Sequence, residues 1–132
     1  MRNVFLVILC SLNFTLLCCK DLSAQEGIIT VSVTKFDGLL KDSDSIQLID
    51  VRTPEEFNAY HLPKAKNINV MSETFVSDIE LLDKSKPVYV YCRSGKRSSK
   101  GAQLMHEAGF LEIYNLDGGI LEWEAHNLAI EK

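Results

Sequence analysis

The chain has 132 residues, of which 46% are apolar and 24% are charged, and its formal net charge is −4. This length suits one globular domain and excludes two domains of ordinary size. The net acidic charge argues against a protein that binds nucleic acid or an anionic membrane surface through its overall electrostatic field.

Residues 1–24 have the pattern of a targeting segment. Arg2 gives a short positive region, and residues 4–19 are apolar apart from a few polar side chains. This run is shorter than the roughly 20 residues that span a bilayer as a helix, and it suits the hydrophobic core of a secretory signal. Three outcomes stay open: a lipoprotein modified at Cys19, ordinary cleavage after Ala24, and an uncleaved anchor. We therefore expect an exported protein of the bacterial periplasm or cell envelope, with a lipid anchor in the first case.

Strand-like and helical patterns alternate along residues 28–130, which we interpret as a single domain. Continuous apolar or β-branched runs predict strands, and apolar residues at helical spacing predict helices. The expected strands are 28–33, 46–51, 65–70, 87–91 and 113–116, and the expected helices are 34–41, 53–60, 73–82, 98–108 and 119–126. This order predicts an α/β fold of three layers, with about five parallel strands and helices on both faces. A site is then expected at the carboxyl ends of the strands, where Asp50 and Cys92 lie.

Cys92 is the only cysteine of the expected domain, and it ends the fourth strand. No internal disulfide is available, and a free thiol in an oxidising compartment needs a chemical reason. Residues 93–98 join this strand to a helix through a tight turn, in which Gly95 permits a positive φ. Such a turn points backbone N–H groups inward, and the helix N-terminus, Lys96 and Arg97 add positive charge that favours the thiolate. An inert, buried cysteine is the alternative, and the turn favours the reactive thiol.

Four ordered motifs give residues 30–128 a resemblance to the single-domain rhodaneses, which are sulfurtransferases. The motifs are Ile49-Asp50-Val51-Arg52 with Glu55-Glu56-Phe57, His61-Leu62-Pro63 with Ala65 and Asn67-Ile68, the segment from Val90 to Ser98, and Asp117-Gly118-Gly119 with Trp123. Two positions depart from the family, which often has glycine where this chain has Tyr60 and Lys64. Both lie away from the cysteine segment, so they concern the shape of a local turn.

The resemblance implies a persulfide carried on Cys92. The thiolate would take a sulfane sulfur from a small anionic donor such as thiosulfate and pass it to cyanide or a thiol, by covalent relay. The residues that would cradle the persulfide and bind the anion are Arg93, Ser94, Gly95, Lys96 and Arg97. No cofactor is expected, and no Cys/His spacing predicts a metal site.

Asp50 and Arg52 are candidates for supporting roles around the site. Asp50 either faces the turn and holds a cation or amide there, or pairs with Arg52 or caps a turn. His61 is interpreted as a structural hydrogen-bonding residue, and residues 117–119 are interpreted as a turn that starts the last helix.

Three other functions stay open. The first is a non-catalytic binding module built on a rhodanese fold. The second is a sulfur carrier that delivers persulfide to another envelope protein. The third is a cysteine phosphatase or arsenate reductase, which needs an arginine after the five residues that follow the cysteine. This chain has Ser98 there and Arg97 one position early, so the turn is one residue short for a tetrahedral oxyanion.

Overall fold

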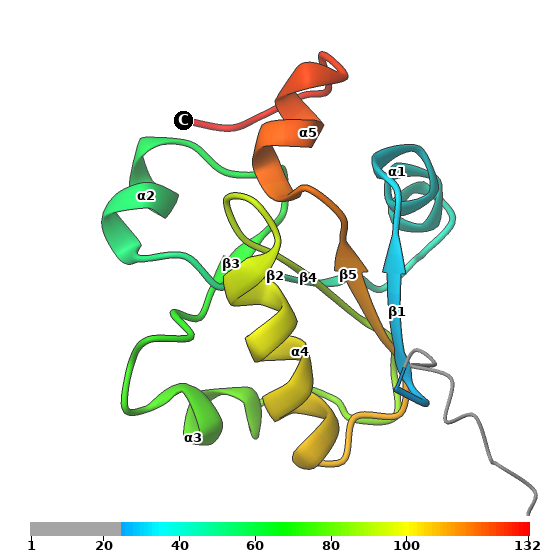
Figure 1. The fold of residues 1–132 in the computed structure, drawn as a ribbon, viewed down its shortest axis with the longest axis vertical. Helices are drawn as coiled ribbons and strands as arrows, with labels where there is room; N and C mark the ends of the chain where they lie inside the picture. Colours follow the sequence, from blue (N-terminus) through cyan, green and yellow to red (C-terminus); the bar gives the residue numbers. More distant parts are fainter. Residues whose placement is uncertain (1–24) are drawn as a thin grey trace, which may run out of the picture.

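The computed structural model describes residues 25–132, and the predicted targeting segment with Cys19 lies outside the described residues. Strands and helices alternate along the described part (Figure 1). They are β1 (Ile28–Val31), α1 (Val33–Lys41), β2 (Gln47–Asp50), α2 (Pro54–Ala59), β3 (Lys66–Asn67), α3 (Phe75–Ile79), β4 (Val88–Tyr91), α4 (Lys96–Glu107), β5 (Ile113–Leu116) and α5 (Gly119–Ala125). None of the helices in residues 25–132 has the length and apolar character needed to cross a bilayer.

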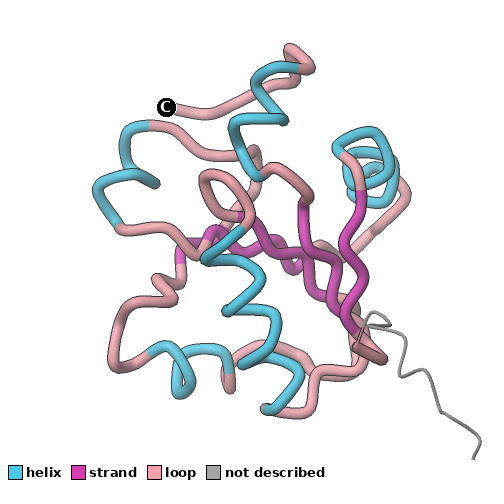
Figure 2. The backbone as a smooth tube through the Cα atoms, in the orientation of Figure 1, coloured by secondary structure: helices cyan, strands magenta, loops and turns pink. Residues whose placement is uncertain are grey.

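The strands form one sheet in the order β1-β5-β4-β2-β3, and every neighbouring pair is parallel. Figure 2 shows this sheet crossing the middle of the molecule with helices on its two sides. The predicted α/β fold of three layers is confirmed. Because β4 lies at the centre of the sheet and helices cover both of its faces, all four of its residues are buried, as is typical of parallel sheets.

Alternate residues of β4 face two separate apolar cores. Val88 and Val90 pack on the side of α3 and α4, whereas Tyr89 and Tyr91 pack on the side of α1 and α5. Because side chains alternate along a strand, the next residue, Cys92, returns to the side of α3 and α4. The alternation of the central strand therefore decides that the thiol faces the helix that follows it.

Two elements have half of their predicted length or less. The strand expected at 65–70 is reduced to β3, although Ile68 and Val70 still donate backbone hydrogen bonds to residues 50 and 51. The Asn67 amide donates to the carbonyl oxygens of Asp50 and Arg52, at 3.0 and 2.9 Å, and so fastens this edge of the sheet by a side chain. The helix expected at 73–82 is reduced to α3, because its end tightens into i→i+3 turns.

Lys64 has a φ of 66°, in the left-handed region that favours glycine. This is one of the two positions at which the sequence departs from the family. The backbone therefore keeps a turn that suits glycine, and the lysine side chain is accommodated at a cost in conformational energy of about 1–2 kcal/mol.

Candidate active site

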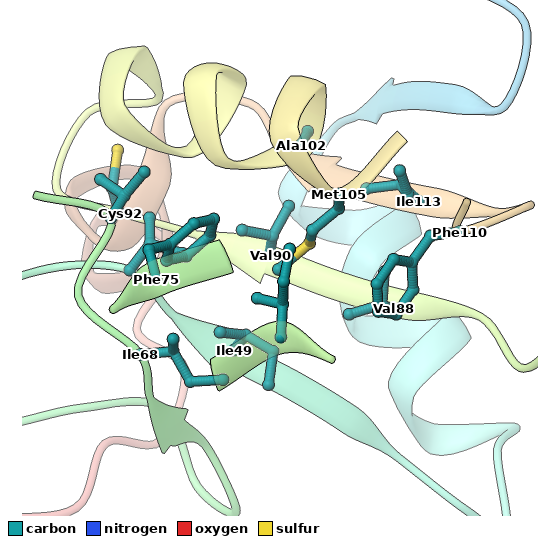
Figure 3. Packing of buried hydrophobic residues seen from close by; sticks show 13 residues of the cluster. Ile49, Ile68, Phe75, Val88, Val90, Cys92, Ala102, Met105, Phe110 and Ile113 are labelled. Carbon is teal, nitrogen blue, oxygen red and sulfur yellow. The ribbon is translucent and has the colours of Figure 1, made fainter. Parts of the chain in front are cut away.

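Cys92 follows β4 directly, at the carboxyl end of the sheet. The residue is 1% exposed and belongs to the apolar core on the side of α3 and α4. In Figure 3 its sulfur points away from Phe75 and the other labelled apolar side chains, toward the segment that leads into α4. Burial alone is typical of an inert cysteine, so the polar groups around the sulfur decide its chemistry. We call residues 92–98 the Cys92 loop.

The Cys92 loop surrounds the sulfur with hydrogen-bond donors. The backbone N–H of Gly95 donates to Cys92 Sγ over 3.0 Å, and Gly95 has a φ of 107° that a side chain would disfavour. Burial raises the pKa of the Cys92 thiol, but hydrogen bonds from the Ser98 hydroxyl and from the N–H groups of Ser98, Gly95 and Ser94 outweigh it. The net result is a lowered pKa, because these donors stabilise the thiolate more than burial destabilises it.

Ser98 is a contributor that the sequence interpretation missed. It is fully buried in the first turn of α4, and its hydroxyl donates to the Gly95 carbonyl oxygen over 3.1 Å. The hydroxyl carries one proton, so it can serve this carbonyl or the sulfur at any moment, and ionisation of the thiol favours the sulfur. The available signal was its place three residues after Gly95, in the first turn of the helix that follows the loop.

The first turn of α5 holds the opposite side of the Cys92 loop. The N–H of Ile120 donates to the carbonyl oxygen of Cys92 over 2.9 Å, and the N–H of Leu121 donates to that of Arg93 over 3.2 Å. Gly119 allows this approach, because a Cβ atom there would lie 2.5 Å from the Cys92 carbonyl oxygen. With these carbonyls turned toward α5, the loop is free to present N–H groups to the sulfur. The predicted turn therefore also braces the thiol segment.

The cationic side chains of the Cys92 loop differ in their surroundings. Arg93 and Lys96 are exposed. Arg97 is partly buried, and both of its terminal nitrogens bind the carboxylate of Glu56 from α2, at 2.7 and 2.8 Å. The hydrogen bond from Arg97 is the main cause that lowers the pKa of Glu56 to about 2, with bonds from Thr53 adding to it. In the sequence, Glu56 is a member of the first motif and no partner is predicted for it.

Asp50 and Arg52 form a buried ion pair beside the loop, at 0% and 2% exposure, with 2.7 Å between Arg52 Nη2 and Asp50 Oδ2. Asp50 is opposite Tyr91 in the sheet, one residue before the thiol. The Arg52 guanidinium also donates to the Tyr60 carbonyl over 2.7 Å and lies 5.4 Å and 5.8 Å from the ring centroids of Tyr60 and Tyr91. Of the two arrangements expected for Asp50, the structure has the pairing with Arg52.

Comparison with known proteins decides the family. The sequence model of the rhodanese-like domain family matches residues 32–126. The chain belongs to the rhodanese-like domain family. A thiosulfate sulfurtransferase named GlpE from Shewanella oneidensis is 34% identical over 88 residues, which cover 67% of this chain and 85% of that protein. The uncharacterized protein YqhL from Bacillus subtilis is 44% identical over 77 residues, which cover 58% of this chain and 60% of that protein.

A solved structure of a rhodanese-like domain protein has the same fold. A crystal structure of a rhodanese-like domain protein from Staphylococcus aureus superposes with a TM-score of 0.67 at 27% identity, and the match covers 79% of this chain and 99% of that one. In this rhodanese-like domain, the donors around the sulfur lie at residues 94, 95 and 98 of the predicted motif. Residues 25–132 contain no group of three His, Cys, Asp or Glu side chains arranged to hold a metal ion.

Proposed function

We propose that this rhodanese-like domain is a sulfurtransferase that carries sulfur as a persulfide on Cys92. The observation that carries the proposal is the hydrogen bond from the Gly95 N–H to the Cys92 sulfur, within a loop whose donors lower the pKa of the thiol. The thiolate is the nucleophilic form of cysteine. Relatives named thiosulfate sulfurtransferase, including the GlpE of Shewanella oneidensis, support the same reaction class.

In the first step, the Cys92 thiolate attacks the outer sulfur of a donor such as thiosulfate. A bond forms between Cys92 Sγ and that sulfur, the sulfur–sulfur bond of the donor breaks, and sulfite leaves with the electron pair. The product is a persulfide whose negative charge lies mainly on its outer sulfur. Loop N–H groups that already point at the thiolate can stabilise this anion without reorganisation, which is the usual advantage of a preorganised anion site.

In the second step, cyanide or a thiolate attacks the outer sulfur of the persulfide. The new bond forms between acceptor and sulfur, the persulfide bond breaks, and its electron pair returns to Cys92 as the thiolate. The cycle needs no other oxidant or reductant, because the sulfane sulfur passes between two nucleophiles. The same donors of the Cys92 loop stabilise the leaving thiolate.

The exposed cations of the Cys92 loop are proposed to bind the donor anion. Arg93 and Lys96 are exposed, and Lys100 follows one helical turn later. In a chain whose formal charge is −4, this positive charge is local. It would attract an anionic donor and hold sulfite as it leaves.

The test is a thiosulfate:cyanide assay that compares the wild-type protein with Cys92→Ala. We expect thiocyanate from the wild type, only background from the variant, and one added sulfur atom on the wild-type Cys92 peptide after thiosulfate alone. Equal rates in the two proteins would overturn the proposal.

The alternative functions give other outcomes. If no sulfur adduct forms, the non-catalytic binding module gains support, and hydrolysis of a chromogenic phosphate ester would instead favour a phosphatase. Comparing cyanide with a small thiol and a protein thiol separates a detoxifying enzyme from a sulfur carrier.

Export is a separate proposal, based on the sequence of residues 1–24. Lipid labelling and fractionation of the wild type and of Cys19→Ser would separate the outcomes. Label that depends on Cys19 supports a lipoprotein, whereas an unlabelled protein that begins after Ala24 supports ordinary secretion.

A further inference from the structure

The carboxylate of Glu56 is held by groups from two different helices. Its two oxygens accept from Arg97 Nη1 and Nη2, at 2.7 and 2.8 Å. Oε2 also accepts from the backbone N–H and the hydroxyl of Thr53, at 3.1 and 3.0 Å, as part of the capping box that begins α2. The carboxylate is therefore fixed in position, and through Arg97 it is bound to the first turn of α4, which also carries Ser98.

Arg97 connects this carboxylate to the Cys92 loop. It lies between Gly95 and Ser98, two of the residues whose donors lower the pKa of the Cys92 thiol. Its pKa is raised, first by the hydrogen bond with Glu56 and further by the negative charges of Glu56 and Cys92. The Arg97 guanidinium is thus within electrostatic range of the thiolate, and Glu56 compensates its charge.

We propose that Glu56 is a positioning residue that sets the charge at the Cys92 loop. By binding Arg97 through both oxygens, it fixes the guanidinium and cancels its charge, so that the exposed Arg93 and Lys96 are the cations that an incoming donor meets. This inference rests on the proposed function, because it assigns to Glu56 control over which donor charge the sulfurtransferase accepts.

The reason for such a balance lies in the two opposing effects of positive charge on a nucleophilic thiol. More positive charge increases the fraction of thiolate, but a thiolate of lower pKa is intrinsically less nucleophilic. An uncompensated Arg97 would also hold dianionic thiosulfate and sulfite more tightly than a monoanionic donor. Glu56 therefore reduces the preference of the site for highly charged anions.

The variant that tests this is Glu56→Gln. Glutamine also serves in capping boxes, so one oxygen remains for Thr53, while the charge and the second bond to Arg97 are lost. The matched control is Glu55→Gln, which removes one negative charge from the same helical turn at an exposed position. Glu56→Asp, which retains the charge, is the conservative variant, and thermal melts establish that each protein is folded.

The first measurement does not depend on sulfur transfer. The pH dependence of iodoacetamide alkylation, followed on the Cys92 peptide by mass spectrometry, reports the thiol pKa. At low salt we expect the midpoint to fall by about half a unit to one unit in Glu56→Gln and to stay near the wild type in Glu55→Gln and Glu56→Asp. The shift should shrink in 1 M salt, where the screening length is about 3 Å. In Glu56→Gln/Arg97→Gln, both charges are absent and the midpoint should return toward the wild type.

The second measurement is the transfer reaction with donors of different charge. We expect the KM for thiosulfate to fall about threefold in Glu56→Gln, with a smaller change for a monoanionic thiosulfonate. An unchanged alkylation midpoint, together with a loss of kcat that follows the loss of thermal stability, would reduce Glu56 to a structural brace and overturn the inference. If the alkylation midpoint shifts in Glu56→Gln but the wild-type protein transfers no sulfur, the charge-setting role is supported and the proposed function is refuted.

Discussion

Gly119 is packed directly against the backbone of Cys92. A Cβ atom at this position would lie 2.5 Å from the Cys92 carbonyl oxygen and equally close to the backbone of Arg93, and Gly119 has a φ of 61°. The N–H of Ile120, the next residue, donates to the same Cys92 carbonyl. The absence of a side chain at Gly119 therefore lets the start of α5 orient the segment that carries the thiol.

We expect Gly119→Ala to displace the Cys92 loop. Thiocyanate formation should fall by more than about tenfold, because misplacing a reacting group by an ångström has effects of that size or larger. Stability should fall by about 2–4 kcal/mol from the clash and the strained φ. Gly38→Ala is the control, since a Cβ in that part of α1 meets nothing within 4 Å. Wild-type turnover by Gly119→Ala would refute the bracing role.

The Ser98 hydroxyl is expected to hold down the pKa of Cys92. In Ser98→Ala the sulfur loses this donor while burial still opposes ionisation, so the pKa should rise. Below the midpoint, each unit of this rise lowers the thiolate fraction, and with it the alkylation rate, about tenfold. Ser99→Ala is a matched control, because the Ser99 hydroxyl donates to the same Gly95 carbonyl over 2.8 Å from an exposed position. Identical midpoints for the two variants would contradict the assignment.

Acid should weaken the link between Glu56 and Arg97. The pKa of Glu56 is lowered from 4.5 to about 2, so its carboxylate contributes stability that is fully present above pH 4.5 and is lost as the pH falls toward 2. Because Glu56→Gln does not titrate there, the stability difference between wild type and variant should shrink over this window. Urea unfolding at a series of pH values measures it. A difference that stays constant down to pH 2 would show that the ion pair adds nothing to folding.

Lys64→Gly should stabilise the domain. The φ of 66° at Lys64 costs a non-glycine residue about 1–2 kcal/mol, part of which is offset by the greater unfolded-state entropy of glycine. We expect a net gain of about 0.5–1 kcal/mol in urea unfolding. Asn127→Gly is a useful comparison at a φ of 54°, where the gain should be smaller because asparagine tolerates this region. A loss of stability in Lys64→Gly would mean that the lysine side chain contributes packing that outweighs the strain.

The order of elements and the place of the thiol were predictable from local pattern. The apolar run of β4 and the glycine at 95 put Cys92 at the carboxyl end of a strand and before a helix, and the structure has it there. The Thr53–Glu56 capping box was also predictable, because its two partners are three residues apart. Hydrophobic periodicity, turn residues and helix caps depend on a few neighbouring residues, so they can be recognised in the linear sequence.

The partners of the thiol segment depended on the tertiary structure. Glu56 and Arg97 are 41 residues apart, and each has an ordinary local explanation, one as a helix cap and the other as a loop cation. The sequence predicts Gly119 as a turn residue, and only the tertiary structure puts the start of α5 against the Cys92 carbonyl. The sequence alone predicted an α/β sheet of parallel strands in which Cys92 ends a buried strand and precedes a helix. Which groups hold that loop and balance its charge was decided only by packing, because those contacts join elements that approach one another only when the sheet and its helices assemble.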